Sequence, residues 1–455
     1  MIKELKYLWK LIQPIAIRLL ALVLASFVGS AAAILVSLLI LLIDLSKGKL
    51  TYVLIVFLSL LLFSDSNAPM FFQSGKNAKD LALILLSLYL IVKGKTNFQY
   101  SYLKYFAFYI LIAFIGLLFA NFNTIGLQKL LSYALVIWVV PVFLFLIFEK
   151  GEGLIFSRQI IVTFAFLYII SIVLSRLNPF YFAQFGRFNG IHRNPNGVGI
   201  FATLFIMNIY ILREKFRDIF SKKVFYLIVG VFVFCVVLSG SRNAIISLGV
   251  FALFSVLRIK LVLGFLIVLI FASSYQFILM QIESLILSSN LENELRLDTL
   301  SYASGRIYIW QACWMEIQNN YWLGHGFSYE EYSKWDKAYY KILPMLIHNY
   351  GNIHNSYLTI WLNTGLLGLI AFLFGIIRYV VKFQFKSKLL APFIFGAFFL
   401  AFFESYLVAS LNPYTWQLWF AFFIVSIQIK PTIFINKQPI KTSMAEEISS
   451  VDKPY

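Results

Sequence analysis

The stretch that decides the fold runs from Glu283 to Ile353 and leads into the sequence HNSY at residues 354–357. Apart from the C-terminal tail, it is the only long polar segment in a chain otherwise made of apolar runs. His354 opens the apolar run that follows it. Two short arginine-bearing stretches, around Arg187 and Arg242, lie on the same side of a membrane as this segment if the runs are successive spans. We therefore expect the functional site where these pieces meet.

The composition supports a membrane protein. Of the 455 residues, 61% are hydrophobic and 13% are charged, and the mean hydropathy is +0.83. A soluble domain cannot hide that much apolar side chain from water, whereas repeated apolar runs of spanning length are typical of helical membrane proteins. The net charge of +18 comes from Lys and Arg in short loops beside these runs, as the positive-inside rule describes. This pattern argues against nucleic acid as a partner and for the lipid bilayer.

Charge also predicts the orientation of the spans. The short loops at 213–223, 258–260 and 378–388 are basic and are expected in the cytoplasm. The long segment 283–353 carries eight acidic and five basic residues, which a translocated loop tolerates. We therefore predict an all-α, polytopic protein with about 12 (12–14) transmembrane helices and one long extracytoplasmic loop. The upper number requires that Gly29-Ser30 divides the run Leu19–Ile43 into a hairpin, which the sequence leaves open.

The expected organisation has five parts. N-terminal helices occupy 1–175, core helices with the arginine motifs occupy 176–282, the extracytoplasmic loop occupies 283–353, C-terminal helices occupy 354–429, and a cytoplasmic tail occupies 430–455.

Two cations lie close together just before one predicted span. Arg187 and Arg193 are on the side of the membrane where cations are depleted, and both snorkelling to lipid phosphates and binding of a substrate anion account for them. Asn194-Pro195 predicts a helix start, with Asn as the cap and Pro at the first helical position. The free N–H groups at such a helix end favour an anion.

Arg242 has similar surroundings. Ser239-Gly240-Ser241 predicts a tight turn, with Ser241 as the cap of a helix that begins at Arg242. Two outward-facing helix ends, each beside a guanidinium, favour a ligand with more than one phosphate.

Histidine is the best candidate for moving a proton near neutral pH. His354 and His348 both lie near the point where the long loop enters the membrane, and either could be the base; we prefer His354. Glu404 lies in an apolar run, where a carboxylate is a functional candidate, but it has no obvious partner and is left out of the predicted site. The sequence shows no metal-ligand cluster and no phosphate-binding or dinucleotide motif, so we expect no metal and no cofactor.

Over residues 180–380 the order of these motifs resembles the O-antigen ligase and polymerase superfamily of bacterial envelope enzymes. No single motif is specific, but the series together is. The matching pieces are Gly186-Arg187 with Asn194-Pro195-Asn196, Ser239-Gly240-Ser241-Arg242, Ser304-Gly305-Arg306 through Trp310, Gly324-His325-Gly326-Phe327, His354-Asn355-Ser356-Tyr357 and Gly365-Leu366-Leu367-Gly368.

The resemblance implies transfer of a glycan from an undecaprenyl diphosphate carrier to a sugar hydroxyl, without metal or nucleotide sugar. It implies that Arg187 and Arg242 hold the carrier diphosphate, that His354 activates the acceptor hydroxyl, and that Arg306 helps from the loop. Attack opposite the leaving group would invert the anomeric centre. Arg193, Asn194, Asn355 and His348 complete the expected substrate-binding set.

The leading hypothesis is a metal-independent inverting glycosyltransferase of the bacterial inner membrane, with its active site facing the periplasm. It would ligate a finished polysaccharide to lipid A–core or a similar saccharide acceptor in lipopolysaccharide or surface polysaccharide biosynthesis. A repeat-unit polymerase uses the same donor chemistry and is the close alternative. A polysaccharide transporter or flippase, with the arginines along a substrate path, and a scaffold of an envelope assembly complex are the others.

Overall fold

A computed structural model describes residues 2–95, 101–120, 123–184, 186–259, 262–264, 266–267, 306–332 and 352–427. The elements are α1 (Ile2–Val28), α2 (Ser30–Ser46), α3 (Leu50–Phe63), α4 (Pro69–Gly75), α5 (Ala78–Val92), α6 (Leu103–Phe119), α7 (Thr124–Glu149), α8 (Gly153–Leu177), α9 (Pro179–Phe182), β1 (Ala183–Gln184), β2 (Arg187–Phe188), α10 (Pro195–Lys215), α11 (Lys222–Ser239), α12 (Arg242–Leu257), α16 (Arg306–Asn319), α17 (Tyr329–Tyr332), α19 (Ser356–Phe383), α20 (Leu390–Ala401) and α21 (Thr415–Ser426).

The chain is predominantly helical, as predicted, and the short antiparallel pair β1–β2 is the exception among the described residues. Six described helices are long and apolar enough to cross a membrane. They are α1 from Lys6 onward, α7, α8, α10, α11 and α19, and several shorter apolar helices accompany them. Most of the predicted span at 261–282, the tail 430–455 and most of the loop 283–353 lie outside the described residues.

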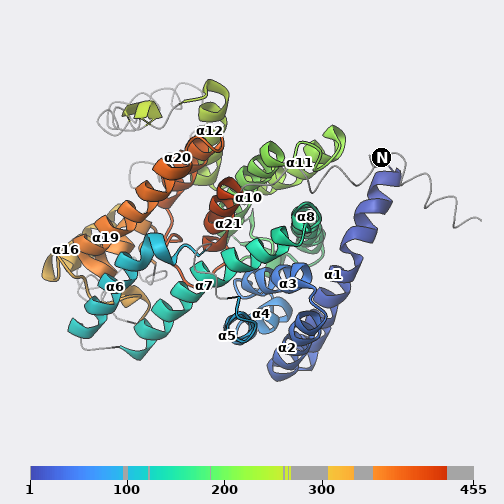
Figure 1. Cartoon of the computed structure of the whole chain (residues 1–455), viewed down its shortest axis with the longest axis horizontal. Helices are drawn as coiled ribbons and strands as arrows, with labels where there is room; N and C mark the ends of the chain where they lie inside the picture. The colour runs from blue at the N-terminus through green and yellow to red at the C-terminus, as the bar shows by residue number, and fades with distance from the viewer. Residues whose placement is uncertain are drawn as a thin grey trace, which may run out of the picture.

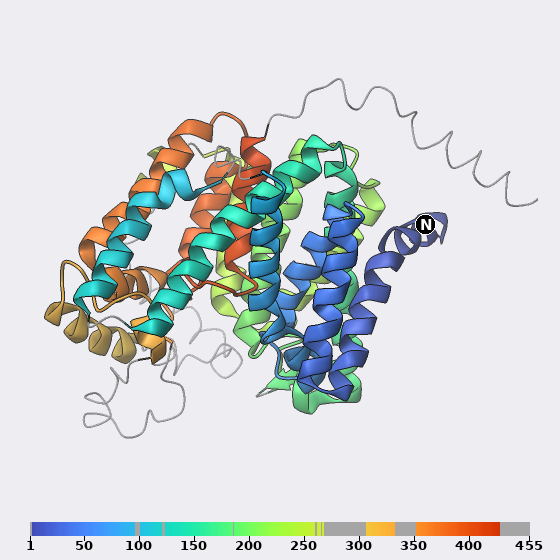
Figure 2. The same cartoon turned by 60° about the horizontal axis from the view of Figure 1, so that its bottom comes forward.

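The first apolar run forms two helices rather than one. α1 ends at Val28, and Gly29 adopts a φ of 143°, a conformation that suits glycine, before α2 begins. Arg18 of α1 and Asp44 of α2 form an ion pair with 2.6 Å between Nε and Oδ2. Because these residues lie on either side of Gly29, the pair closes α1 and α2 into a hairpin, which Figure 2 shows at the N-terminal side of the bundle.

The helices surround a buried centre formed by α21 and α10. Every residue of α21 from Thr415 to Val425 is buried, and in α10 nearly all residues are. Figure 1 shows α21 in the middle of the bundle, with α10 beside it. The short loop from Phe402 to Tyr414 leads into this centre, and Glu404, Tyr406 and Leu407 in it are buried.

α6 and α19 pack against each other in opposite directions. A Cβ on Gly375, near the end of α19, would lie 2.7 Å from the carbonyl oxygen of Tyr105, near the start of α6. At the other end, a Cβ on Gly116 of α6 would lie 4.0 Å from the carbonyl oxygen of Asn363. Glycine at both points allows the two backbones to approach closely, as is common between helices in membranes.

α19 is broken at Gly365, and part of the long loop fills the break. Gly365 has φ +69°, and a Cβ there would lie 2.1 Å from the carbonyl oxygen of Trp322. The N–H of His325 donates to the Leu362 carbonyl at 2.9 Å, and the N–H of Leu366 donates to the carbonyl of Tyr321 at 2.9 Å. The turn at 321–326 is thereby hydrogen-bonded into the first part of α19.

α16 begins at Arg306 of the Ser304-Gly305-Arg306 motif, and its aromatic side chains contact other parts of the protein. Trp310 Nε1 donates to the carbonyl of Ile353 at 3.0 Å, and the rings of Trp314 and Trp361 meet edge to face. Ile317 is fully buried. α16 lies across the end of the bundle where α19 begins (Figure 2), so the start of α16 and the residues before α19 come together there.

Candidate active site

Three side chains from distant segments meet at the Glu404 carboxylate. Glu404 Oε1 accepts a hydrogen bond from Arg306 Nη2 at 2.8 Å, and Glu404 Oε2 lies 3.3 Å from His354 Nδ1. Arg306 is the first residue of α16, His354 precedes α19 by two residues, and Glu404 lies in the loop after α20. The side chains of Glu404 and Arg306 are 5% and 10% exposed, whereas that of His354 is 23% exposed. His354 is therefore the member that a substrate can reach most directly.

The charge of Glu404 is maintained despite its burial. Burial raises the pKa of the carboxyl, but the charge of Arg306 and the hydrogen bond with His354 oppose this and leave the pKa below its ordinary value of 4.5. An ionised carboxylate beside Nδ1 favours the tautomer of His354 that carries its proton on Nδ1. In that tautomer Nε2 has a free lone pair and can accept a proton.

The backbone at His354 is held in a conformation that few non-glycine residues adopt. His354 has φ +52°, in the left-handed region. Its N–H donates to Asn352 Oδ1 at 3.0 Å, and the next residue, Asn355, caps α19 by accepting from the N–H groups of Tyr357 and Leu358. Such strain persists only where the surroundings hold it, and it is common at functional sites. Asn355, predicted to bind substrate, is occupied as a helix cap.

The loop that carries Glu404 is fastened to the start of α19. The Ser356 hydroxyl donates to the Glu404 carbonyl at 2.7 Å and accepts from the N–H of Tyr406 at 3.0 Å. The N–H of Asn355 donates to Ser405 Oγ at 3.0 Å. These bonds fix Glu404 relative to His354, because His354 and Ser356 belong to the same turn.

Glu404 corrects the prediction from sequence, which left it out for want of a partner. Its two partners lie 98 and 50 residues earlier in the chain, so no local pattern connects them. The rarity of a carboxylate in an apolar run was the one signal available. The second histidine, His348, lies outside the described residues.

The two predicted arginines converge on one turn. Arg187 Nε donates to the carbonyl of Ser239 at 2.7 Å, and its Nη2 donates to Asn196 Oδ1 at 2.9 Å. Gly240 follows with φ +56°, and a Cβ there would lie 3.3 Å from Arg187 Nε. α12 then begins at Arg242, as predicted. The side chain of Arg187 therefore rests on the turn from which Arg242 emerges.

The two helix starts beside these arginines differ in how they are capped. Asn194 caps α10 as predicted, with its Oδ1 accepting from the N–H of Gly197 at 2.9 Å and Pro195 at the first helical position. Ser241 also stands at the cap position of α12, but its side chain makes no capping hydrogen bond, so that prediction is wrong. The reason is packing: Ser241 Oγ faces α10, where a Cβ on Gly199 would come within 3.0 Å of it. The close approach brings the starts of α10 and α12 together.

The segment before α10 is hydrogen-bonded to a residue in the N-terminal part of the chain. The carbonyl of Arg193 accepts from Asn67 Nδ2 at 2.6 Å, which fixes the backbone beside the Asn194 cap.

The loop 402–414 connects the Arg306–Glu404–His354 cluster with the start of α10, which packs against the turn at residues 239–242, here called the arginine turn. At its far end, Tyr414 Oη lies 3.1 Å from His192 Nδ1, and a Cβ on Gly197 would lie 2.5 Å from that hydroxyl. α12 and α20 are also joined, because Ser247 Oγ donates to the carbonyl of Gly396 at 2.8 Å. Both contacts place the start of α12 and the loop after α20 at the same end of the bundle.

A buried polar network that was not predicted from the sequence lies where the loop 402–414 meets the segment before α10. His192 is fully buried, with Nδ1 2.9 Å from Asp65 Oδ2 and Nε2 2.5 Å from the Tyr168 hydroxyl. The Tyr414 hydroxyl donates to the same Asp65 oxygen. Asn189 Nδ2 donates to the His192 carbonyl at 3.0 Å. The four ring and carboxylate groups come from four separate segments, and sequence reasoning had no means of pairing them.

Within the described ranges, no group of three or more His, Cys, Asp or Glu side chains has the arrangement of a metal site. Arg306, Glu404 and His354 form a cluster joined by an ion pair and a hydrogen bond.

Residues 227–373 match a family model described as O-antigen ligase. The matched region contains Arg242, Arg306 and His354, and it ends before Glu404. A comparison with curated proteins found no match.

Proposed function

We propose that the chain, whose residues 227–373 match the O-antigen ligase model, transfers a glycan from undecaprenyl diphosphate to a hydroxyl of a saccharide acceptor. The observation that carries the proposal is the contact between His354 Nδ1 and Glu404 Oε2, at 3.3 Å. A carboxylate on one ring nitrogen of a side chain that is 23% exposed leaves the second nitrogen to act as a general base on a sugar hydroxyl. The site is proposed to face the periplasm across the bacterial inner membrane.

His354 Nε2 takes the proton of the acceptor hydroxyl in this proposal. The hydroxyl oxygen attacks the anomeric carbon, and the bond from that carbon to the phosphate oxygen breaks. The electron pair leaves with undecaprenyl diphosphate, so the reaction needs no oxidant or energy-rich cosubstrate. Attack from the face opposite the leaving group inverts the anomeric centre.

Glu404 and Arg306 act on His354 rather than on the sugar. The Glu404 carboxylate stabilises the imidazolium that forms when Nε2 takes the proton, and Arg306 keeps that carboxylate ionised in its buried position. The family resemblance implied that Arg306 assists catalysis from the loop. We propose that it does so through its hydrogen bond to Glu404.

Arg187 and Arg242 are proposed to hold the departing diphosphate. The starts of α10 and α12 add backbone N–H groups and the positive ends of two helix dipoles. Charge grows on the leaving oxygen as the glycosidic bond breaks, and preorganised donors at that point typically lower the barrier by about 3–4 kcal/mol each. Arg193, immediately before the Asn194 cap, is proposed as a further contact to the carrier phosphates.

The direct test uses the purified full-length protein in lipid nanodiscs with a lipid-diphosphate glycan and candidate acceptors. Release of undecaprenyl diphosphate that depends on the acceptor is the expected result. His354→Ala should abolish release while the protein still folds. His325→Ala is the matched control, because His325 is a loop histidine that bonds to the Glu316 carbonyl, away from Glu404. Transfer by His354→Ala at the wild-type rate overturns the mechanism.

Ligase and polymerase share this donor chemistry, and the product separates them. In cells that lack the protein, loss of capped lipopolysaccharide with retention of carrier-linked polymer indicates a ligase, our preferred assignment. Accumulation of single repeat units indicates the polymerase. A flippase would move the carrier-linked glycan across the membrane without releasing undecaprenyl diphosphate.

A further inference from the structure

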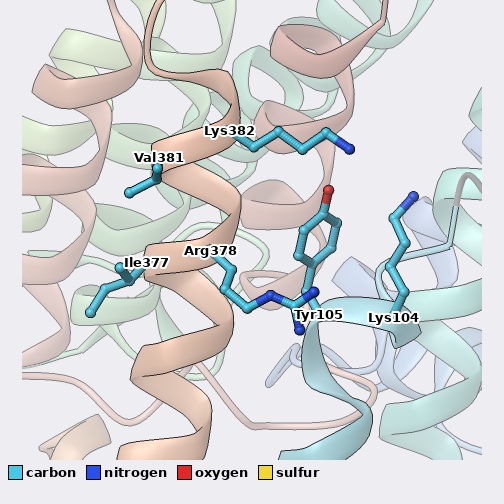
Figure 3. A pocket seen from close by; sticks show the side chains of 6 residues that line it. All are labelled: Lys104, Tyr105, Ile377, Arg378, Val381 and Lys382. Carbon is cyan, nitrogen blue, oxygen red and sulfur yellow. The ribbon is translucent and has the colours of Figure 1, made fainter.

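A basic pocket lies at the opposite end of α19 from His354. It has a volume of about 430 Å³. Figure 3 shows three cationic side chains grouped around the ring of Tyr105. The lining residues are Lys104, Tyr105, Ile377, Arg378, Val381 and Lys382.

The three charged residues among the described residues that line this pocket are all cations. Lys104 comes from the first turn of α6, and Arg378 and Lys382 come from the last turns of α19. Arg378 Cζ lies 5.9 Å from the centroid of the Tyr105 ring. None of the six lining residues is a carboxylate, and the segment 96–100 just before α6 contains no Asp or Glu. Three like charges repel one another, so an anion in the pocket is favoured.

An apolar stripe on α19 leads into the pocket. Ile370, Phe374, Ile377 and Val381 are spaced four, three and four residues apart, which places them on one face of a helix. Their exposed fractions are 54%, 52%, 57% and 56%. In a spanning helix, a face of this kind contacts lipid tails.

α6 carries a matching stripe that begins at the pocket. Lys104, Phe108 and Leu111 are four and three residues apart, and Phe108 and Leu111 are 61% and 52% exposed. Because α6 and α19 pack in opposite directions, both stripes extend from the same basic end along neighbouring helices.

The length of α19 separates this pocket from the proposed active site. α19 is broken at Gly365, and the part after the break, residues 366–383, alone extends about 27 Å, close to the roughly 30 Å hydrocarbon thickness of a bilayer. The pocket therefore lies at the other membrane surface. That surface also carries Lys386 and Lys388, in the basic loop expected to be cytoplasmic.

We propose that this pocket binds an anionic phospholipid of the cytoplasmic leaflet. Lys104, Arg378 and Lys382 contact the phosphate of the head group, and the acyl chains lie along the stripes of α6 and α19. Basic pockets between transmembrane helices on the cytoplasmic side recognise such head groups. The stripes are what distinguish a lipid from a free phosphate ion, because only the lipid gains contacts along them.

The test measures lipid retention by native mass spectrometry on the full-length protein in neutral detergent. Phosphatidylglycerol, cardiolipin and phosphatidylethanolamine are added separately, and inorganic pyrophosphate is the free-anion arm. We expect the two anionic lipids to bind at least about tenfold more tightly than phosphatidylethanolamine or pyrophosphate. Equal binding of phosphatidylethanolamine overturns the proposal, as does displacement of the anionic lipids by stoichiometric pyrophosphate.

Variants locate the binding to the pocket. Arg378→Gln combined with Lys382→Gln should weaken retention of the anionic lipids about tenfold. Lys93→Gln combined with Lys95→Gln removes the same charge from exposed positions after α5 and should change retention by less than about twofold. Equal losses in the two double variants would mean general surface attraction and overturn the proposal. Lys382→Gln alone, at an exposed position, provides a milder variant should the pocket double variant unfold.

Discussion

The guanidinium of Arg306 donates a hydrogen bond to the Glu404 carboxylate at 2.8 Å, although 98 residues separate them in the chain. Both side chains are nearly buried, and the second carboxylate oxygen is left to face His354. A buried ion pair is a costly arrangement unless its remaining hydrogen-bonding capacity is used. Here His354 uses it, so the pair and the proposed base form one electrostatic unit.

The first prediction concerns Glu404→Gln. The glutamine amide can still accept a hydrogen bond from His354, but it cannot stabilise an imidazolium by charge, and it leaves Arg306 buried without a counter-ion. We expect transfer to fall about 100-fold and unfolding to become easier by about 3–5 kcal/mol. Glu316→Gln is the control, because the Glu316 carboxylate in α16 accepts its hydrogen bond from Tyr329 of α17. Release of undecaprenyl diphosphate and thermal unfolding measure the two effects; wild-type transfer by Glu404→Gln would remove Glu404 from the mechanism.

The second prediction concerns Glu330, a carboxyl in α17. Burial, and then the charge of Glu331, raise its pKa from 4.5 to about 7. Within the described part of the chain, its buried Oε2 has no hydrogen-bond partner. A raised folded pKa means that the folded state holds a proton that the unfolded chain releases. The associated stability is present below pH 4.5 and is lost as the pH rises to about 7.

Glu330→Gln should therefore stabilise the protein near pH 8 by about 3 kcal/mol and change little near pH 4.5. Thermal unfolding across this pH range measures the effect. Glu331→Gln is the matched neighbour: it removes the lesser cause of the raised pKa but also breaks the 2.7 Å ion pair with Lys129, so it should stabilise the protein at high pH less than Glu330→Gln does. A wild-type stability that stays constant from about pH 5 to pH 8 would contradict the role given to Glu330.

The third prediction concerns Arg187→Lys. The arginine donates at once to the Ser239 carbonyl and to Asn196, and a lysine ammonium cannot span both in that geometry. We expect the KM for the lipid-diphosphate donor to rise about tenfold, because the turn before Arg242 loses its support. Arg176→Lys, in the last turn of α8, is the control. An unchanged KM for the donor would show that Arg187 does not contribute to binding the diphosphate.

The sequence predicted those parts of the site that depend on near neighbours. Asn194 caps α10 through a contact three residues along the chain, and Arg242 follows its turn directly, so both were found. The cap at Ser241 was wrong, because the approach of α10 through Gly199 decides where that side chain faces.

No pattern in the sequence could identify the hydrogen-bond partners of Glu404 or those of His192. Their partners are brought to them by the packing of whole helices. The apolar runs predicted the helical fold well, since spanning length and hydropathy are local properties. The sequence left the hairpin at Gly29 open, and the ion pair between Arg18 and Asp44 in the structure shows it.

The last prediction concerns Tyr414→Phe. The Tyr414 hydroxyl donates to Asp65 and contacts His192, so it ties the end of the loop 402–414 to the segment before α10. Removing the hydroxyl should cost about 1–2 kcal/mol of stability. It should also lower kcat about tenfold, because Glu404 at the start of this loop loses a fixed position relative to the arginine turn.

Tyr406→Phe is the matched control for Tyr414→Phe. Tyr406 is a fully buried tyrosine of the same loop, and its hydroxyl donates at 2.6 Å to the carbonyl of Ala397 in α20 rather than to Asp65. It should lose similar stability but retain most of its kcat. If the two variants lose activity in proportion to stability alone, the network of Asp65, His192 and Tyr414 contributes only to folding. A larger fall in kcat for Tyr414→Phe at equal stability assigns the network to positioning the catalytic loop.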